Sequence, residues 1–186
     1  MKCYKLIEDC DCLEQISHEA MSWIRENTDL MENWPDLFWN KIDYKHFLLQ
    51  NPTLVKWCVD RKLAIREVAV LFATSEPGSE NSRIVEQLHT DDGPLRSKIN
   101  FPIYNTKDTW TEWYDVPDAP PFGGPAQSLA DRDLSKLEKI AEVETIKPVV
   151  FNSSIPHKVR IGPNANIPRL QLAVMFWQNI DHMLED

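Results

Sequence analysis

A histidine and an aspartate two positions apart, His89 and Asp91, are the first residues in this sequence whose types and spacing indicate chemistry. In a β-strand, residues i and i+2 point to the same face, so this imidazole and carboxylate can bind one metal ion. Asp92 follows directly and leaves the carboxylate ligand open, although the two-residue period favours Asp91. Chance alone gives roughly 0.8 such His-x-acid pairs with five histidines and 29 acidic residues, so the pair needs a third ligand.

His157 is the candidate third ligand, in the segment KPVVFNSSIPHKVRI. An apolar strand, a polar Asn-Ser-Ser turn and a second short strand place this histidine at a strand edge. Two histidines and one carboxylate form the facial triad of non-haem Fe(II) oxygenases, which leaves other coordination positions open. The three residues therefore predict an iron site.

Two further stretches have the residue alternation of β-strands and carry charged or polar side chains on one face. Arg169 opens RLQLAVMFW, in which every second residue from Leu170 to Phe176 is apolar. A buried arginine is costly alone, but its planar guanidinium suits bidentate binding of a carboxylate. Lys98 and Asn100 lie on the polar face of the strand after the His-x-Asp pair. The sequence therefore combines a candidate metal site with a candidate carboxylate site.

The order His-x-Asp, a later histidine and then an arginine resembles the Fe(II)/2-oxoglutarate-dependent oxygenase superfamily, whose catalytic core is a double-stranded β-helix. RSKINFPIYN and VVFNSSIPHKV are most similar to the aspartyl/asparaginyl-hydroxylase-like and phage-encoded members, and the resemblance covers about residues 60–178. It implies that His89, Asp91 and His157 bind iron. It also implies that Arg169 binds the distal carboxylate of 2-oxoglutarate.

The resemblance also concerns the rest of the cosubstrate site. It implies that Lys98 and Asn100 help to hold the end of 2-oxoglutarate nearer the metal. Many members have Ser or Thr two residues after the arginine, where this chain has Gln171, which is longer but can still donate a hydrogen bond. A carboxylate at position 91 argues against the halogenating members, in which a small residue leaves room for a halide.

The implied activity is that of a dioxygenase using Fe(II), O2 and 2-oxoglutarate. It converts 2-oxoglutarate to succinate and CO2 and hydroxylates an amino-acid side chain of a protein, a peptide or a small molecule. One alternative is a cupin-like metal enzyme, an isomerase or dioxygenase that does not use 2-oxoglutarate, for which Arg169 and Lys98 have no carboxylate to hold. Another is a non-catalytic jelly-roll binding module whose polar residues are simply solvated.

Length and composition set further expectations. A chain of 186 residues is expected to form one domain. The net charge of −9 argues against nucleic-acid and anionic membrane partners, and the absence of a long apolar stretch favours a cytoplasmic protein. In that setting the four cysteines, which form no C-x-x-C pair, are expected to be reduced thiols. A Cys/His zinc site that uses Cys10 and Cys12 is an alternative, although their spacing does not match a known zinc ribbon or finger. The sequence does not indicate an oligomeric state.

The periodicity predicts a mainly β fold with flanking helices and a double-stranded β-helix (jelly-roll, cupin-like) core at residues 64–178. Residues 1–63 form a mostly helical and aromatic supporting segment, with helices at 11–27 and 51–63. Loops are expected at 75–82 and 117–128. A hairpin turn at 162–168 is expected to make the His157 and Arg169 strands neighbours, so that both face one pocket.

Overall fold

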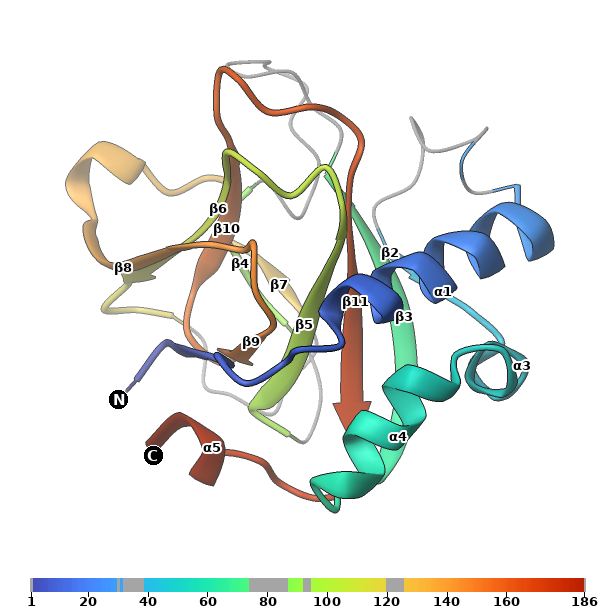
Figure 1. The fold of residues 1–186 in the computed structure, drawn as a ribbon. Helices are drawn as coiled ribbons and strands as arrows, with labels where there is room; N and C mark the ends of the chain where they lie inside the picture. The colour runs from blue at the N-terminus through green and yellow to red at the C-terminus, as the bar shows by residue number, and fades with distance from the viewer. Residues whose placement is uncertain are drawn as a thin grey trace.

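Two antiparallel β-sheets form the centre of the molecule, with helices packed on one side (Figure 1). The structure, a computed structural model, describes residues 2–29, 31, 39–73, 87–91, 95–119 and 126–185, and the side chains of 39–41 are not described. The prediction of a mainly β fold with flanking helices is confirmed. The predicted loop at 75–82, the middle of the loop at 117–128, residues 30 and 32–38 of the predicted supporting segment, and Asp92 lie outside the described residues.

The first sheet, sheet A, has six strands, and the second, sheet B, has five. Sheet A has the order β1 (Tyr4–Leu6), β9 (Val149–Asn152), β5 (Ser97–Tyr104), β11 (Arg169–Phe176), β3 (Ile65–Ala73) and β2 (Trp39–Lys41). Sheet B has the order β7 (Gln127–Ser128), β4 (His89–Thr90), β10 (His157–Ile161), β6 (Thr109–Asp115) and β8 (Glu138–Glu144). The helices are α1 (Leu13–Asn27), α3 (Tyr44–Leu49), α4 (Pro52–Asp60) and α5 (His182–Glu185), with a 3-10 turn, η2, at Leu134–Lys136.

Eight of these strands form four nested antiparallel pairs, so together they correspond to the two arms of one long hairpin. β6 pairs with β8, β5 with β9, β4 with β10, and β3 with β11, all antiparallel. Successive pairs lie alternately in sheet B and sheet A, so the hairpin is rolled up rather than flat. Strands that are far apart in the sequence, such as β4 and β10, are therefore direct neighbours.

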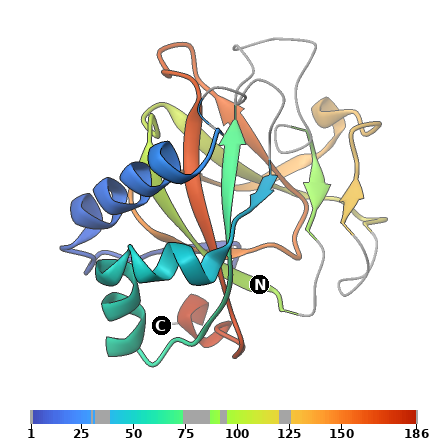
Figure 2. The ribbon, with the colours of Figure 1, turned by 90° about the vertical axis from the view of Figure 1, so that its right-hand side faces the viewer.

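Sheet A is buried on both faces, as its side-chain alternation requires. On β5, Ile99 and Phe101 point outwards into a core shared with α1 and α4, where Phe101 makes an edge contact with Trp57 at 5.2 Å between ring centroids. The alternate residues, Lys98 and Asn100, point inwards towards sheet B. Figure 2 shows the blue and teal helices on one side of the long strands and sheet B on the other. Sheet A thus carries an apolar face towards the helices and a partly polar face towards the site.

The predicted hairpin at 162–168 is wrong. β10 pairs with β4 and β6 in sheet B, whereas β11 pairs with β3 and β5 in sheet A, so the link between them crosses from one sheet to the other. The link packs on another loop: the N–H groups of Gly162 and Asn164 donate to Asp108. A Cβ at Gly162 would lie 2.2 Å from Asp108 Oδ1, so any larger residue here would have to displace the Asp108 side chain.

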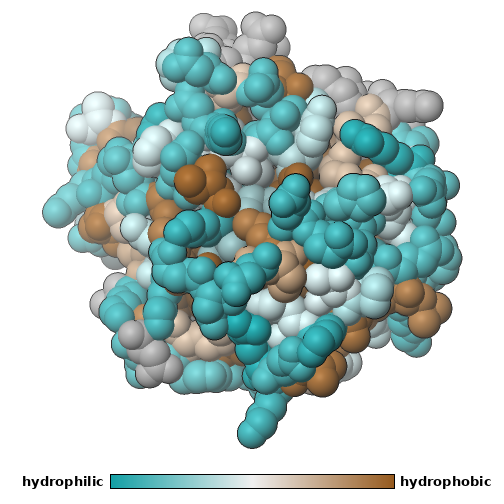
Figure 3. All heavy atoms as spheres, in the orientation of Figure 1, coloured by the Kyte–Doolittle hydropathy of each residue, from teal (hydrophilic) through white to brown (hydrophobic). Residues whose placement is uncertain are grey.

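The outer surface carries no large apolar area in the view of Figure 3, where hydrophobic residues lie in small groups among hydrophilic ones. Within the described part of the chain, no helix combines the length and apolar character needed to cross a membrane.

An ionic cluster on the outer face of sheet B joins β10 to β6. The buried carboxylate of Glu112 accepts hydrogen bonds from Arg160 Nε at 2.7 Å, Tyr114 Oη at 2.8 Å and Lys139 Nζ at 3.3 Å. Burial alone would raise the pKa of Glu112, but these hydrogen bonds outweigh it and hold the pKa below its ordinary value. The ionised form of Glu112 therefore stabilises the pairing of β6 with β10, the strand that carries His157.

Replacing Glu112 by Gln is expected to lower the free energy of unfolding at pH 7 by about 1–3 kcal/mol, because charge-assisted hydrogen bonds are lost. The folded-state pKa lies below the unfolded value of about 4.3, so the carboxylate contributes fully above that value and loses its effect as the pH falls through the folded-state pKa. Urea unfolding should show a smaller difference between wild type and Glu112→Gln at pH 3 than at pH 7. A difference independent of pH would contradict this account; the exposed Glu138→Gln serves as the control.

Candidate metal and carboxylate site

The two histidines of the site lie opposite each other on neighbouring strands. His89 is the first residue of β4 and His157 the first residue of β10, and the two are antiparallel partners in the sheet register. Their ring centroids are 4.4 Å apart. Asp91 follows β4 directly, and its backbone N–H donates to the carbonyl of Ser153 in the turn before β10. The sheet register therefore brings together residues that are distant in the sequence.

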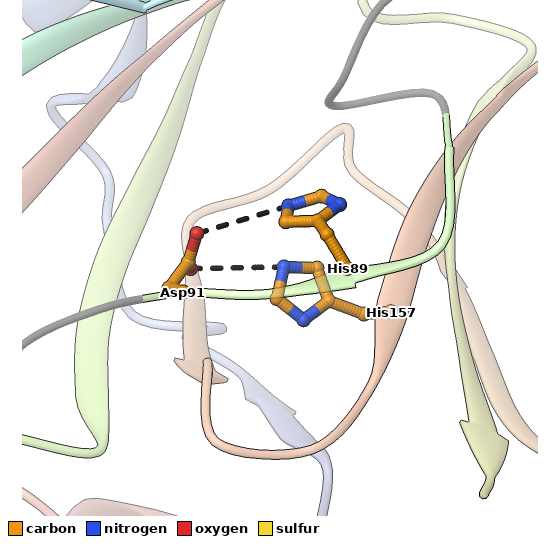
Figure 4. Close-up of side chains that lie close together, drawn as sticks. All are labelled: His89, Asp91 and His157. Atoms are coloured by element: carbon orange, nitrogen blue, oxygen red, sulfur yellow. Dashed lines mark ion pairs between the residues drawn. The ribbon is translucent and has the colours of Figure 1, made fainter. Parts of the chain in front are cut away.

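The three side chains converge on a single point (Figure 4). Asp91 Oδ1 lies 3.7 Å from His89 Nε2, and Asp91 Oδ2 lies 3.6 Å from His157 Nε2. One ligand atom from each residue lies within 4.8 Å of the other two. Two atoms that each bind one metal ion at about 2.0–2.2 Å can lie up to about 4.4 Å apart, so both separations of Asp91 from the histidines fit a shared ion. Asp91 thus supplies the carboxylate of the group.

Backbone carbonyls fix the orientation of both imidazole rings. His89 Nδ1 donates to the carbonyl of Gln87 at 2.8 Å, and His157 Nδ1 donates to the carbonyl of Ile155 at 2.8 Å. A carbonyl accepts only, so each ring carries its proton on Nδ1 and has a lone pair on Nε2. Both lone pairs lie on the side of Asp91. This is the arrangement of metal-binding histidines, whose second nitrogen is usually held by a carbonyl or carboxylate.

The electrostatics keep the imidazoles neutral and the carboxylate ionised. Burial lowers the pKa of His89, and burial together with the neighbouring His89 lowers the pKa of His157 to about 3. Burial alone would raise the pKa of Asp91, but the neighbouring Lys98 ammonium holds the pKa well below its ordinary value. Two neutral nitrogen ligands and one carboxylate are the forms that bind a divalent cation. The residues present therefore fit a metal ion.

Lys98 lies closer to Asp91 than the sequence suggested. Its Nζ donates to Asp91 Oδ2 at 2.6 Å, and it lies 5.2 Å from the centroid of the Phe151 ring, which also packs edge-on against His157. Lys98 and Phe151 are register partners on β5 and β9. Lys98 thus belongs to the immediate surroundings of the candidate metal ligands.

All seven residues predicted to form the site line one pocket between the two sheets. These are His89, Asp91, Lys98, Asn100, His157, Arg169 and Gln171. The pocket encloses about 420 Å³ that protein atoms do not fill, including space open to solvent. The histidine and arginine strands therefore share a pocket although they lie in different sheets.

Two buried amide atoms in this pocket have no hydrogen-bond partner in the protein. They are Asn100 Oδ1 on β5 and Gln171 Nε2 on the neighbouring strand β11. Both side chains are almost fully buried, so an unsatisfied acceptor and an unsatisfied donor are costly. A polar ligand in the pocket would satisfy them.

Two threonine hydroxyls hold Arg169, and sequence reasoning did not identify them. Arg169 on sheet A is 1% exposed, and it reaches across the gap to sheet B, where its Nε donates to Thr109 Oγ1 at 3.1 Å and its Nη2 donates to Thr145 Oγ1 at 2.9 Å. Thr109 in turn donates to the carbonyl of Thr106. The alternation of Thr109, Thr111 and Trp113 gave a signal, because it places all three on one strand face, but it did not identify their partner.

Other candidate ligands do not gather in this way. The four cysteines are free thiols, as predicted. Among the described residues, the one group of three His, Cys, Asp or Glu side chains close enough to share a metal ion is the group at His89, Asp91 and His157. A zinc site at Cys10 and Cys12 is therefore not supported.

The comparisons with known proteins add no assignment to this geometry. No family model and no curated protein matches the sequence. The site itself combines a His-Asp-His group, its lysine neighbour and a threonine-held arginine in one pocket.

Proposed function

We propose that this protein is an Fe(II)- and 2-oxoglutarate-dependent dioxygenase that hydroxylates an amino-acid side chain of a protein, a peptide or a small molecule. The observation that carries the proposal is the convergence of His89, Asp91 and His157, with both imidazole lone pairs on the side of the carboxylate, in the same pocket as Arg169. Either feature alone is common. Together they provide a place for a divalent metal and a separate cation for an organic acid.

The strand pairing supports a double-stranded β-helix as the fold. An eight-stranded hairpin rolled so that its pairs alternate between two sheets is the construction of a jelly roll, the class that includes the cupins. In this chain the pairs β3 with β11, β4 with β10, β5 with β9 and β6 with β8 follow that scheme. β1 and β2 extend sheet A at its two edges, and β7 extends sheet B.

Each residue has a role in holding the reacting components. His89, Asp91 and His157 would bind the iron through one face and leave its remaining positions to other ligands. Iron, O2 and 2-oxoglutarate would together supply the oxidising power and release succinate and CO2. The protein contributes orientation and binding, which is its usual share of cofactor chemistry.

Arg169 is suited to bind the distal carboxylate of the cosubstrate. Thr109 and Thr145 bind the edge of the guanidinium formed by Nε and Nη2, so its plane is fixed before a ligand arrives. The terminal edge, formed by the two Nη atoms, has the geometry that binds a carboxylate. Gln171 lies two residues further along the same strand face, and its Nε2 donor can add a hydrogen bond to the bound acid.

One observation favours the alternative of a metal enzyme that does not use an oxo acid. Both cations of the pocket already have partners in the protein, because Lys98 binds Asp91 and Arg169 binds two threonines. Binding of 2-oxoglutarate distinguishes the two functions.

We expect His89→Ala and His157→Ala each to abolish tight Fe(II) binding, because each variant leaves only two of the three protein ligands. Anaerobic titration of Fe(II) into the purified protein measures this directly. His46→Ala is the matched control, since His46 is exposed on α3 outside the pocket. Wild-type iron affinity in both site variants would refute the metal assignment.

We further expect anaerobic addition of Fe(II) and then 2-oxoglutarate to produce the visible charge-transfer band of a chelated 2-oxo acid on iron. Arg169→Ala should weaken 2-oxoglutarate binding by at least about thirtyfold, the typical loss for one partner of a buried charge pair, while iron still binds. The exposed Arg132→Leu is the control.

Each other outcome of that titration has a definite meaning. Iron binding without the band would favour the metal enzyme that does not use an oxo acid. No iron binding at all would favour the binding module. A band of unchanged strength in Arg169→Ala would remove Arg169 from the cosubstrate site.

A further inference from the structure

Lys98 places its ammonium group inside the candidate metal site. Its Nζ lies 2.6 Å from Asp91 Oδ2, and the side chains of Lys98 and Asp91 are 8% and 19% exposed. The same oxygen lies 3.6 Å from His157 Nε2. A metal ion held between Asp91 and His157 would therefore share its carboxylate oxygen with an ammonium group.

The ammonium of Lys98 has two opposing effects at this position. A buried carboxylate without a counter-charge is costly, so a nearby cation stabilises the fold when no metal is present. Like charges in a partly dry pocket repel over a few ångströms far more strongly than in water. The ammonium that stabilises Asp91 in the metal-free protein thus opposes the arrival of a divalent cation.

We propose that Lys98 is a built-in competitor for the metal: it neutralises Asp91 in the metal-free protein and must give up Asp91 Oδ2 when a divalent cation binds. It therefore lowers the metal affinity of the site. The lysine side chain is long and flexible, and Asn100 lies two residues further along the same inward face of β5. The released ammonium stays in the pocket, beside the unsatisfied Asn100 Oδ1.

The release of Lys98 links metal binding to the binding of an organic acid. This part rests on the proposed function. Once freed from Asp91, the ammonium can pair with a carboxylate of an oxo acid in the same pocket, so the acid should tighten metal binding by holding Lys98 away. Thermodynamic linkage requires the converse as well: the metal should tighten acid binding by the same factor.

The test is a calorimetric titration of Mn²⁺, a divalent probe that needs no oxygen chemistry, into wild type and Lys98→Met. We expect the variant to bind Mn²⁺ about ten to a hundred times more tightly, the usual range of coupling between two sites. Lys98→Gln isolates the charge, because it keeps a hydrogen-bond donor while removing the ammonium, and it decides the question if Lys98→Met does not fold. The exposed Lys107→Met should match wild type.

Thermal unfolding provides a second readout that a purely structural lysine would not give. Without metal, the neutral variants should unfold at a lower temperature than wild type, and saturating Mn²⁺ should raise their unfolding temperature by more than it raises that of wild type. Equal or weaker Mn²⁺ binding in both variants would show that Lys98 supports the ligand rather than competing, and would overturn the proposal while leaving the metal site intact. Absence of Mn²⁺ binding in all proteins would overturn both.

Adding 2-oxoglutarate to the same titration tests the linkage. In wild type it should tighten Mn²⁺ binding, and in Lys98→Met the enhancement should be smaller because no ammonium remains to be held away. An equal enhancement in both proteins would reject the linkage. The titrations without the acid would still decide whether Lys98 competes with the metal.

Discussion

A carboxylate cannot remain ionised between two β-sheets unless neighbouring groups compensate its charge, and this constraint governs the arrangement around Asp91. Lys98 from sheet A supplies the counter-charge, and the imidazoles of His89 and His157 from sheet B face the same carboxylate. The interaction therefore joins the two sheets at one point. The carbonyls of Gln87 and Ile155 orient the two rings in this arrangement.

The rolled strand order explains how so few residues can form such a site. In a flat hairpin, β4 and β5 would follow each other along the same arm, and the candidate ligands at β4 would not face Lys98. Because the strand pairs alternate between sheets, β4 and β5 instead face each other across the interior. The inner face of sheet A can be polar because its outer face, packed under α1 and α4, supplies the hydrophobic core.

Local patterns could predict those parts of the site that depend on period and composition. The i, i+2 spacing of His89 and Asp91 and the polar face of β5 require only that each segment is a strand. Which strands pair with each other was harder to predict, because a short link such as 162–168 can join strands within one sheet or between two sheets. The contacts of Arg169 with Thr109 and Thr145 depend on that crossing, so no pattern near Arg169 could identify them. Likewise, the contact of Lys98 with Asp91 follows from the two sheets facing each other.

The two cations of the pocket differ in a way that bears on function. Arg169 is held rigidly by two hydroxyls on the opposite sheet, and a guanidinium keeps its charge and plane. Lys98 is a flexible point charge that binds Asp91, the carboxylate that a metal would also require. A fixed cation suits a carboxylate that must bind in the same orientation each time. A movable cation can instead leave one carboxylate, Asp91, when a metal binds there and pair with another. In the proposed function, Arg169 would accordingly orient the organic acid, and Lys98 would link the binding of the acid to that of the metal.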